Sequence, residues 1–247
     1  MPDDMDVKPA KPAAKKAGVQ RRQRMQSHLR NEQLLGCAIR VVARNGLGSS
    51  PHAATAKEAS VSVPTVFAYF PTRAALLAEV VADVDRFYED IGKGVLYKGD
   101  ALEAILEFLK ACARMVVQDP DRTRIWLDWS TSVGQGDLWE LYLEFHRKAV
   151  RRIAAVVKRG QADGSIPPTI APNEAALIIA SGSHTVAQMM MTNTPLKTVM
   201  RYEEELVRAA LHLPSRRELE QQRARKDARA LAKGTGTKRK EKVDTPK

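Results

Sequence analysis

The chain has 247 residues, of which 44% are hydrophobic and only 5% aromatic. This content suffices for a folded core, and the prevalence of Ala, Val and Leu favours packed helices over sheets. The net charge of +11 comes from the two ends, because residues 1–30 carry +5, residues 214–247 carry +7 and residues 31–213 carry −1. A nearly neutral body with cationic ends fits a polyanionic partner such as nucleic acid, although such ends also serve solubility alone.

The chain has no run of 18 apolar residues, and its N-terminus lacks the apolar segment of a signal peptide. We therefore expect a cytoplasmic protein, associated with the nucleoid, that is neither secreted nor membrane-spanning. Its two cysteines, Cys37 and Cys112, each stand in an apolar helical run. This favours two buried thiols in a reducing compartment over a disulfide.

The periodicity of apolar residues predicts an all-α protein. Residues 1–20 have a composition typical of disorder, and the first helix is expected from about Ser27 to Asn45. Two short helices, about 51–59 and 62–70, precede a long one that starts after Thr72 and ends before a loop at Gly92, Gly94 and Gly99. Further helices are expected over about 101–117, 121–133, 137–163, 173–192 and 196–213. After Pro214 the chain has few apolar residues, which predicts a solvated helix or a disordered tail.

The two short helices, preceded by a helix and a basic segment, are typical of a helix-turn-helix that binds DNA. The second one must bury one side and present small or polar residues to base edges on the other. We expect Val63, Val66, Phe67 and Phe70 on the inner side. The outward residues are then Ser62, Pro64, Thr65, Ala68 and Tyr69, with Tyr69 and Arg73 placed for phosphate contacts. Short helix pairs also occur as ordinary packing units, so the spacing alone leaves both interpretations open.

The stretch VSVPTVFAYFPTRAALLAEV, residues 61–80, resembles the TetR-family signature V-S-x-x-T-x-x-x-Y-F-P-[ST]-[KR]-x-x-L. It is most similar to the LuxR/HapR group of quorum-sensing master regulators, which share V-S-V-x-T-V-F-x-Y-F-P-T-R. The likeness continues at residues 126–130, WLDWS, and covers roughly residues 20–213. It implies a TetR-like fold: a helix-turn-helix domain over residues 21–75, a helical regulatory and dimerisation domain over 76–213, and basic tails at 1–20 and 214–247.

Three positions depart from that pattern. Thr55 stands where a buried Ile is usual, which is expected to weaken the packing beneath the reading helix. Ser60 replaces the usual Gly of the turn, and Ala68 replaces an outward Asn of the LuxR/HapR group. These departures affect the expected target sequence more than the fold.

The resemblance implies that Arg22 and Arg24, on the group's R-x-R, enter the minor groove beside the reading helix. Paired arginines on a flexible arm independently suit narrow, electronegative minor grooves, while an untargeted basic arm is the alternative. The complete set of residues predicted to contact double-stranded DNA is Arg22, Arg24, His52, Lys57, Ser62, Pro64, Thr65, Ala68, Tyr69 and Arg73.

The resemblance also implies a homodimer formed by the last two helices, 173–192 and 196–213. Helix 173–192 is apolar nearly all round, which requires burial on two sides, and its small run at residues 180–183 allows close backbone approach. A two-fold dimer would place paired reading helices on a near-palindrome. The alternative is that helix 173–192 is the central core helix of a monomer.

A pocket for a small apolar effector is expected among the middle helices, where the family keeps it. Aromatic and methionine side chains at helical spacing are equally consistent with plain core, so both interpretations stay open. His146 stands on a polar stretch and is a candidate for exposure. The residues assigned to this pocket are Tyr88, Ile91, Trp126, Trp129, His146, Val150 and Ser183.

No nucleophile elbow, phosphate loop, paired catalytic carboxylates or metal-spaced Cys/His set occurs in the sequence, so we expect no enzyme, no metal and no cofactor. The leading hypothesis is a dimeric, sequence-specific transcriptional regulator of the quorum-sensing type. Two alternatives are an architectural DNA-coating protein whose basic tails do the binding, and a ligand-binding module that has lost operator recognition.

Overall fold

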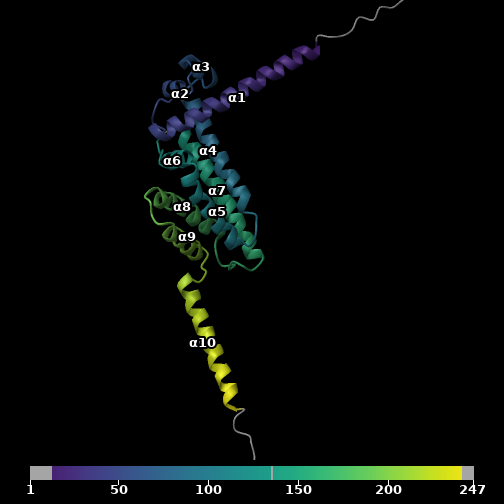
Figure 1. Cartoon of the computed structure of the whole chain (residues 1–247), viewed down its shortest axis with the longest axis vertical. Helices are drawn as coiled ribbons and strands as arrows, with labels where there is room; N and C mark the ends of the chain where they lie inside the picture. The colour runs from purple at the N-terminus through teal and green to yellow at the C-terminus, as the bar shows by residue number, and fades with distance from the viewer. Residues whose placement is uncertain (1–12, 135, 241–247) are drawn as a thin grey trace, which may run out of the picture. The chain divides into compact units, whose positions relative to one another are not determined.

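A computed structural model describes the backbone of residues 13–134 and 136–240, and the side chains of residues 25–134 and 136–228. This part of the chain is all-helical, as expected (Figure 1). The helices are α1 (Ala13–Asn45), α2 (His52–Glu58), α3 (Val63–Tyr69), α4 (Arg73–Val95), α5 (Ala101–Gln118), α6 (Pro120–Ser130), α7 (Asp137–Ala162), α8 (Pro172–Met191), α9 (Leu196–Ala210) and α10 (Arg216–Lys240).

Two predicted boundaries were wrong. Helix α1 begins at Ala13 instead of near Ser27, so part of the N-terminal segment expected to be disordered is helical, while residues 1–12 lie outside the described residues. Helix α4 continues through Gly92 and Gly94 to Val95, because two glycines lower helix propensity without blocking the backbone hydrogen bonds. After Pro214 the chain is helical again as α10, which confirms the solvated-helix alternative over the disordered one.

The helices fall into two compact units. The first comprises residues 1–84 and 124–139, and in it α1 packs against α2 and α2 against α3. Its fully buried side chains come mainly from one stripe of α1 and one of α4, as the apolar periodicity predicts. They include Leu34, Ala38, Leu76, Leu77 and Val80.

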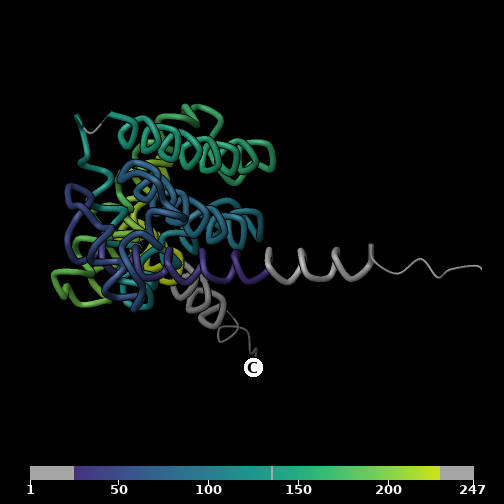
Figure 2. Tube along the Cα trace, turned by 90° about the horizontal axis from the view of Figure 1, so that it is seen from above, coloured from purple at the N-terminus to yellow at the C-terminus, as the bar shows by residue number. Residues whose placement is uncertain are grey.

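The second unit comprises residues 85–123 and 140–247. Its core is formed mainly by α5, α7, α8 and α9, with contacts between α8 and α9 and from α5 to both (Figures 1 and 2). The small residues at 180–183 serve this core. A Cβ at Gly182 would clash with the Leu206 side chain of α9, so the close approach joins two helices of the same chain.

Both cysteines are free and buried, as expected. Burial raises the pKa of the Cys112 thiol to about 12, so at neutral pH this thiol is protonated and unreactive. No single helix in the described ranges is long and apolar enough to cross a membrane. The pair α3 and α4 meets that test only jointly and is bent by 66°.

A buried carboxyl group stands out in the second unit. Glu203 of α9 is 1% exposed, and within the described part of the chain neither of its oxygens has a hydrogen-bond partner. Burial raises the pKa of this carboxyl to about 7; the charges of Lys110 and Arg114 oppose the shift and that of Glu107 adds to it. Ionising Glu203 therefore costs folding free energy around neutral pH.

We predict that Glu203→Gln changes how stability depends on pH. Because the pKa is raised in the folded state, the wild-type stability from this group is complete below about pH 4.5 and is lost as the pH rises through about 7. As the pH rises from 5 to 8.5, the wild type should therefore lose about 1–3 kcal/mol of its free energy of unfolding relative to the variant. Urea unfolding at fixed protein concentration measures this, and parallel pH profiles would contradict it.

Candidate nucleic-acid interface

Helix α2 is tied to α1 by an ion-pair cluster. Glu58 of α2 binds Arg44, and also binds Arg40 through Nε at 2.6 Å. Hydrogen bonds from Arg44 and then Arg40 lower the pKa of Glu58. The cluster is partly exposed, so its contribution to stability is modest, but it orients α2 along α1.

The turn between α2 and α3 has the hydrogen bonds of a Schellman motif. The Val61 N–H donates to the Ala56 carbonyl at 3.0 Å, and the Ser60 N–H donates to the Lys57 carbonyl at 3.2 Å. Ser60 has a φ of +54°, a conformation that a glycine adopts at lower cost. The position that departs from the family's glycine therefore keeps the glycine backbone geometry, and the tight turn is preserved.

Helix α3 begins with a side-chain cap. The Ser62 Oγ accepts a hydrogen bond from the Thr65 N–H at 3.3 Å and lies 2.8 Å from the Thr65 Oγ1. Pro64 occupies the first turn, where its missing N–H costs nothing. The two hydroxyl groups, both predicted to face DNA, are thus paired with each other at the start of the helix.

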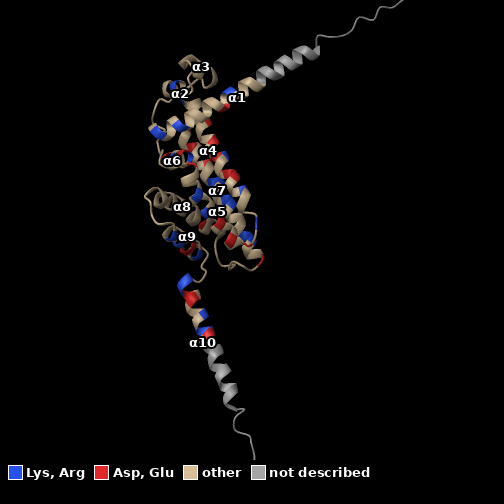
Figure 3. Cartoon of the chain, in the orientation of Figure 1, with Lys and Arg blue, Asp and Glu red and all other residues tan. Residues whose placement is uncertain are grey.

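The outer side of α3 differs from the prediction at two positions. Val66 and Phe70 are buried as expected, but Val63 is 38% and Phe67 is 45% exposed. The prediction of these two as inner residues was wrong, because this seven-residue helix buries only a narrow stripe. Ser62, Pro64 and Ala68 are exposed as predicted, and Thr65 and Tyr69 are half-buried. The accessible side of α3 is therefore apolar and hydroxyl-bearing, with no Lys, Arg, Asp or Glu (Figure 3).

His52 lies inside the motif. It is 7% exposed, its ring stacks on Phe67 with centroids 4.1 Å apart, and its Nε2 lies 2.8 Å from the Phe70 carbonyl oxygen. These contacts join the start of α2 to the end of α3. The structure thus gives His52 a packing role, and its contact with DNA stays a prediction.

Arg73, predicted to contact phosphate, donates to two backbone carbonyls of the loop between α1 and α2. Its Nη2 lies 2.5 Å from the Leu47 oxygen and its Nε 2.7 Å from the Ser49 oxygen. Asp128 of α6 accepts the Leu47 N–H at 2.6 Å from the other side. These contacts position the loop that leads into α2. Asp128 was not predicted as a functional residue, since nothing in the local sequence indicates a contact 81 residues away.

The remaining predicted DNA contacts lie on α2 and α1. Lys57 is exposed near the end of α2. Arg22 and Arg24 belong to helix α1, so their backbone is helical and does not form the flexible arm that we expected. Their side chains lie outside the described residues.

The residues assigned to an effector pocket mostly have partners within the chain. The Trp129 indole donates to the Leu138 carbonyl at 2.7 Å, and the Ser183 hydroxyl donates to the Ala180 carbonyl at 2.6 Å. The Tyr88 hydroxyl lies 3.4 Å from that of Thr123, and Val150 packs on the core of the second unit. Ile91 and His146 are half-buried, and burial lowers the pKa of His146, while Trp126 is buried.

Trp126 and Trp129 belong to the first unit and the other five predicted pocket residues to the second. Two hollows on the second unit, of about 420 and 250 Å³, are lined by other residues. The contacts of Trp129, Ser183 and Val150 favour plain core for these three side chains.

Comparison with known proteins supports the resemblance seen in the signature. No protein-family model matches the chain. A segment of 127 residues is 35% identical to the HTH-type transcriptional regulator LuxR of Vibrio harveyi. The matched segment covers 51% of this chain and 62% of LuxR. The chain therefore matches less than two thirds of this relative's length.

Solved structures give the fold. The regulator FadR of Bacillus subtilis, solved with stearoyl-CoA, matches with a TM-score of 0.61 and 18% identity over 73% of this chain and 97% of FadR. The TetR-family regulator CifR, solved with a 26-base-pair operator DNA, matches with a TM-score of 0.61 and 19% identity over 72% of this chain and 95% of CifR. The chain has the TetR fold. Helices α2 and α3 are the two short helices for which the sequence predicted a helix-turn-helix.

We predict that the departure at Thr55 weakens this domain. Thr55 is fully buried, and its hydroxyl has no hydrogen-bond partner among the described residues. Thr55→Val removes the unsatisfied hydroxyl and keeps the volume, so the free energy of unfolding should rise by about 1 kcal/mol. The matched control Thr55→Ser keeps the hydroxyl and loses the methyl, and should lower it by about 1 kcal/mol. A destabilised Val variant in urea unfolding would contradict the prediction.

Proposed function

We propose that this protein is a TetR-type transcriptional regulator that binds specific operator DNA as a homodimer. The observation that carries the proposal is the helix-turn-helix geometry: a short helix α3, held by α2 across a Schellman turn, with an accessible side free of charge. Its similarity to LuxR, a regulator by name, and the operator DNA in the CifR complex support the same function.

The chemistry of α3 indicates how bases would be recognised. Val63, Phe67 and Ala68 are exposed and apolar, and apolar side chains recognise the thymine methyl group in the major groove. The paired hydroxyls of Ser62 and Thr65 supply hydrogen-bonding groups beside them. We therefore propose that α3 prefers sites with thymine at the central contacted positions.

Exposed apolar side chains on α8 and α9 support the proposed dimer. Five large apolar side chains of these helices are between 38 and 58% exposed, which is costly unless another surface covers them. A second copy of the chain, packing the same surface by two-fold symmetry, would bury them and pair two α3 helices for a near-palindromic site. The five residues are Leu177, Ile178, Met191, Leu196 and Met200.

Modulation by a small apolar ligand is proposed from FadR, which was solved with stearoyl-CoA, and the quorum-sensing role from the similarity to LuxR. That the seven predicted pocket residues bind such a ligand stays a prediction. An operator as target places the protein in the cytoplasm, at the nucleoid. No catalytic role is assigned to any residue.

The specificity of binding tests the proposed function. Genome-wide mapping of bound sites would supply the operator, and the affinity for operator and scrambled duplexes would then be compared at physiological salt. A specific regulator should prefer its operator by at least about 1000-fold. A ratio near one would instead favour the architectural DNA-coating protein.

A charge on α3 gives a sharper test. Ala68→Glu brings a carboxylate to the exposed side of the reading helix, where it faces DNA phosphates, and should reduce operator affinity by roughly 100-fold. Ala155→Glu places the same change on an exposed position of α7 and should leave operator affinity unchanged. Equal affinities of the two variants would overturn the assignment of α3 as the reading helix.

The proposed minor-groove role of Arg22 and Arg24 is tested by salt dependence. Replacing both with Ala removes four arginines from the homodimer. Operator binding should weaken and the slope of log K against log salt should fall by up to about 4, since each phosphate that loses its arginine keeps its counterion. The control, Lys98→Ala with Lys158→Ala, removes two exposed charges from the second unit. An affinity and slope equal to the control's would contradict the role.

A further inference from the structure

Helix α10 concentrates positive charge in one part of the chain. It contains ten basic and three acidic residues. Two of the acidic residues, Glu218 and Glu220, lie near its start, so residues 223–240 carry eight basic residues and one acidic residue. The described side chains of Arg217, Arg223, Arg225 and Lys226 are exposed, and no ion pair is formed by them within the described ranges.

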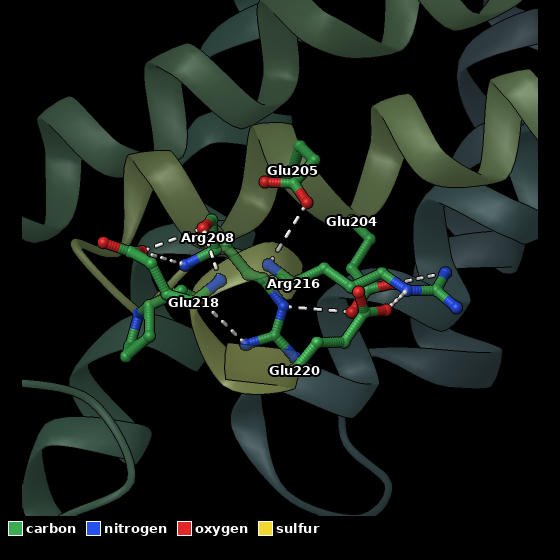
Figure 4. Close-up of polar contacts among 8 residues, drawn as sticks. Glu204, Glu205, Arg208, Arg216, Glu218 and Glu220 are labelled. Carbon is green, nitrogen blue, oxygen red and sulfur yellow. Dashed lines mark hydrogen bonds and ion pairs between the residues drawn. The ribbon is translucent and has the colours of Figure 1, made fainter. Parts of the chain in front are cut away.

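The start of α10 is fixed to α9 by polar contacts (Figure 4). Ser215 and Glu218 form a capping box: the Glu218 N–H donates to the Ser215 Oγ at 3.2 Å, and the Ser215 N–H donates to the Glu218 Oε2 at 2.8 Å. The backbone N–H of Arg216 donates to the Glu205 Oε1 at 3.2 Å, and the Arg216 Nη1 forms an ion pair with the Glu204 Oε2 at 3.8 Å.

The carboxylates at this junction are therefore used within the chain. Glu218 caps the helix, and Glu220 accepts a hydrogen bond from the Arg216 Nε at 3.3 Å. A defined helix thus leads away from α9, and the cations that follow have few acidic neighbours. The described cations Arg223, Arg225 and Lys226 therefore stand on a helix whose start is fixed, which differs from a loose cationic tail.

The spacing of these cations suits a polyanion with regular charges. Of the basic residues with described side chains, Arg223 and Lys226 are three residues apart, a step that returns to one side of a helix, and the sequence has further basic residues at 229, 233 and 240. From residue 223 to residue 240 the helix rises about 26 Å at 1.5 Å per residue. Double-stranded DNA carries one phosphate charge per about 1.7 Å of its axis, so such an array meets several phosphates.

Other partners fit the helix less well. Binding in a membrane interface needs a continuous apolar face, and a coiled coil needs apolar residues at heptad spacing. The only large apolar residues of α10 are Leu219 and Leu231. This chain covers 97% of FadR and 95% of CifR, yet more than a quarter of its own residues have no counterpart in either. The TetR fold is therefore complete without part of this chain.

We propose that α10 is a second DNA contact, which binds phosphates without regard to sequence and adds to operator reading by α3. The inference rests on the proposed function for its choice of DNA as the polyanion. Contacts of this kind raise affinity for all duplexes and speed association, and they make both strongly dependent on salt.

The test compares two triple variants of the full-length protein. Arg223→Gln, Arg225→Gln and Lys226→Gln remove three exposed cations of α10 and keep residues of good helix propensity. Lys93→Gln, Lys98→Gln and Lys158→Gln remove three exposed cations that lie outside α8, α9 and α10. Both variants and the wild type are titrated with salt on operator and on scrambled duplexes.

The homodimeric α10 variant lacks six cations, so it should lose up to about 5 from the slope of log K against log salt, and about 10-fold or more in affinity at physiological salt, on both duplexes alike. The control should match the wild type. The inference would be overturned if the α10 variant had the same slope as the wild type on the scrambled duplex. Loss of binding to vesicles of anionic phospholipid with unchanged DNA binding would also overturn it, since this would identify a membrane surface as the partner.

The two proposals fail in different measurements. If the protein showed no preference for operator over scrambled duplex, the proposed function would be overturned. The loss of salt dependence in the α10 variant would still be measured and would still test the role of α10. A retained operator preference with no change of slope on removing the three charges would overturn the role of α10 alone.

Discussion

A seven-residue helix cannot fold on its own, so the reading helix α3 depends on the contacts that hold it from outside. Three of them matter most. His52 stacks on Phe67 and reaches the Phe70 carbonyl, the Schellman turn fixes the angle to α2, and the Ser62 side chain caps the first turn. Helix α2, only seven residues long itself, is in turn held to α1 through Glu58. The geometry of recognition is therefore a property of the whole motif.

In the function proposed here, the charge distribution divides the work of binding DNA between two kinds of surface. Helix α3 carries no charge, so it contributes shape, methyl contacts and hydroxyl groups, which discriminate between bases. Positive charge is concentrated in the chain ends, where it contributes affinity that does not depend on sequence. An uncharged reading surface combined with cationic ends allows selectivity and overall affinity to be changed separately by mutation.

The departures from the family signature have different physical consequences. Ser60 adopts the backbone conformation of the glycine it replaces, so the turn survives at a cost in strain. Thr55 buries a hydroxyl group without a partner among the described residues, so the cost falls on stability. Ala68 is exposed, so its replacement of Asn leaves the packing unaffected, and in the proposed function it changes which bases α3 recognises.

The sequence by itself determined the all-helical class and most helix positions, including the two short helices α2 and α3, because periodicity, caps and prolines act locally along the chain. Only the tertiary structure decided which sides of α3 are covered, since the exposure of Val63 and Phe67 depends on how narrow the contact with neighbouring helices is. It also decided that His52 packs inside and that Arg73 and Asp128 hold the same loop. Such contacts join residues far apart in the chain, and no local pattern encodes them.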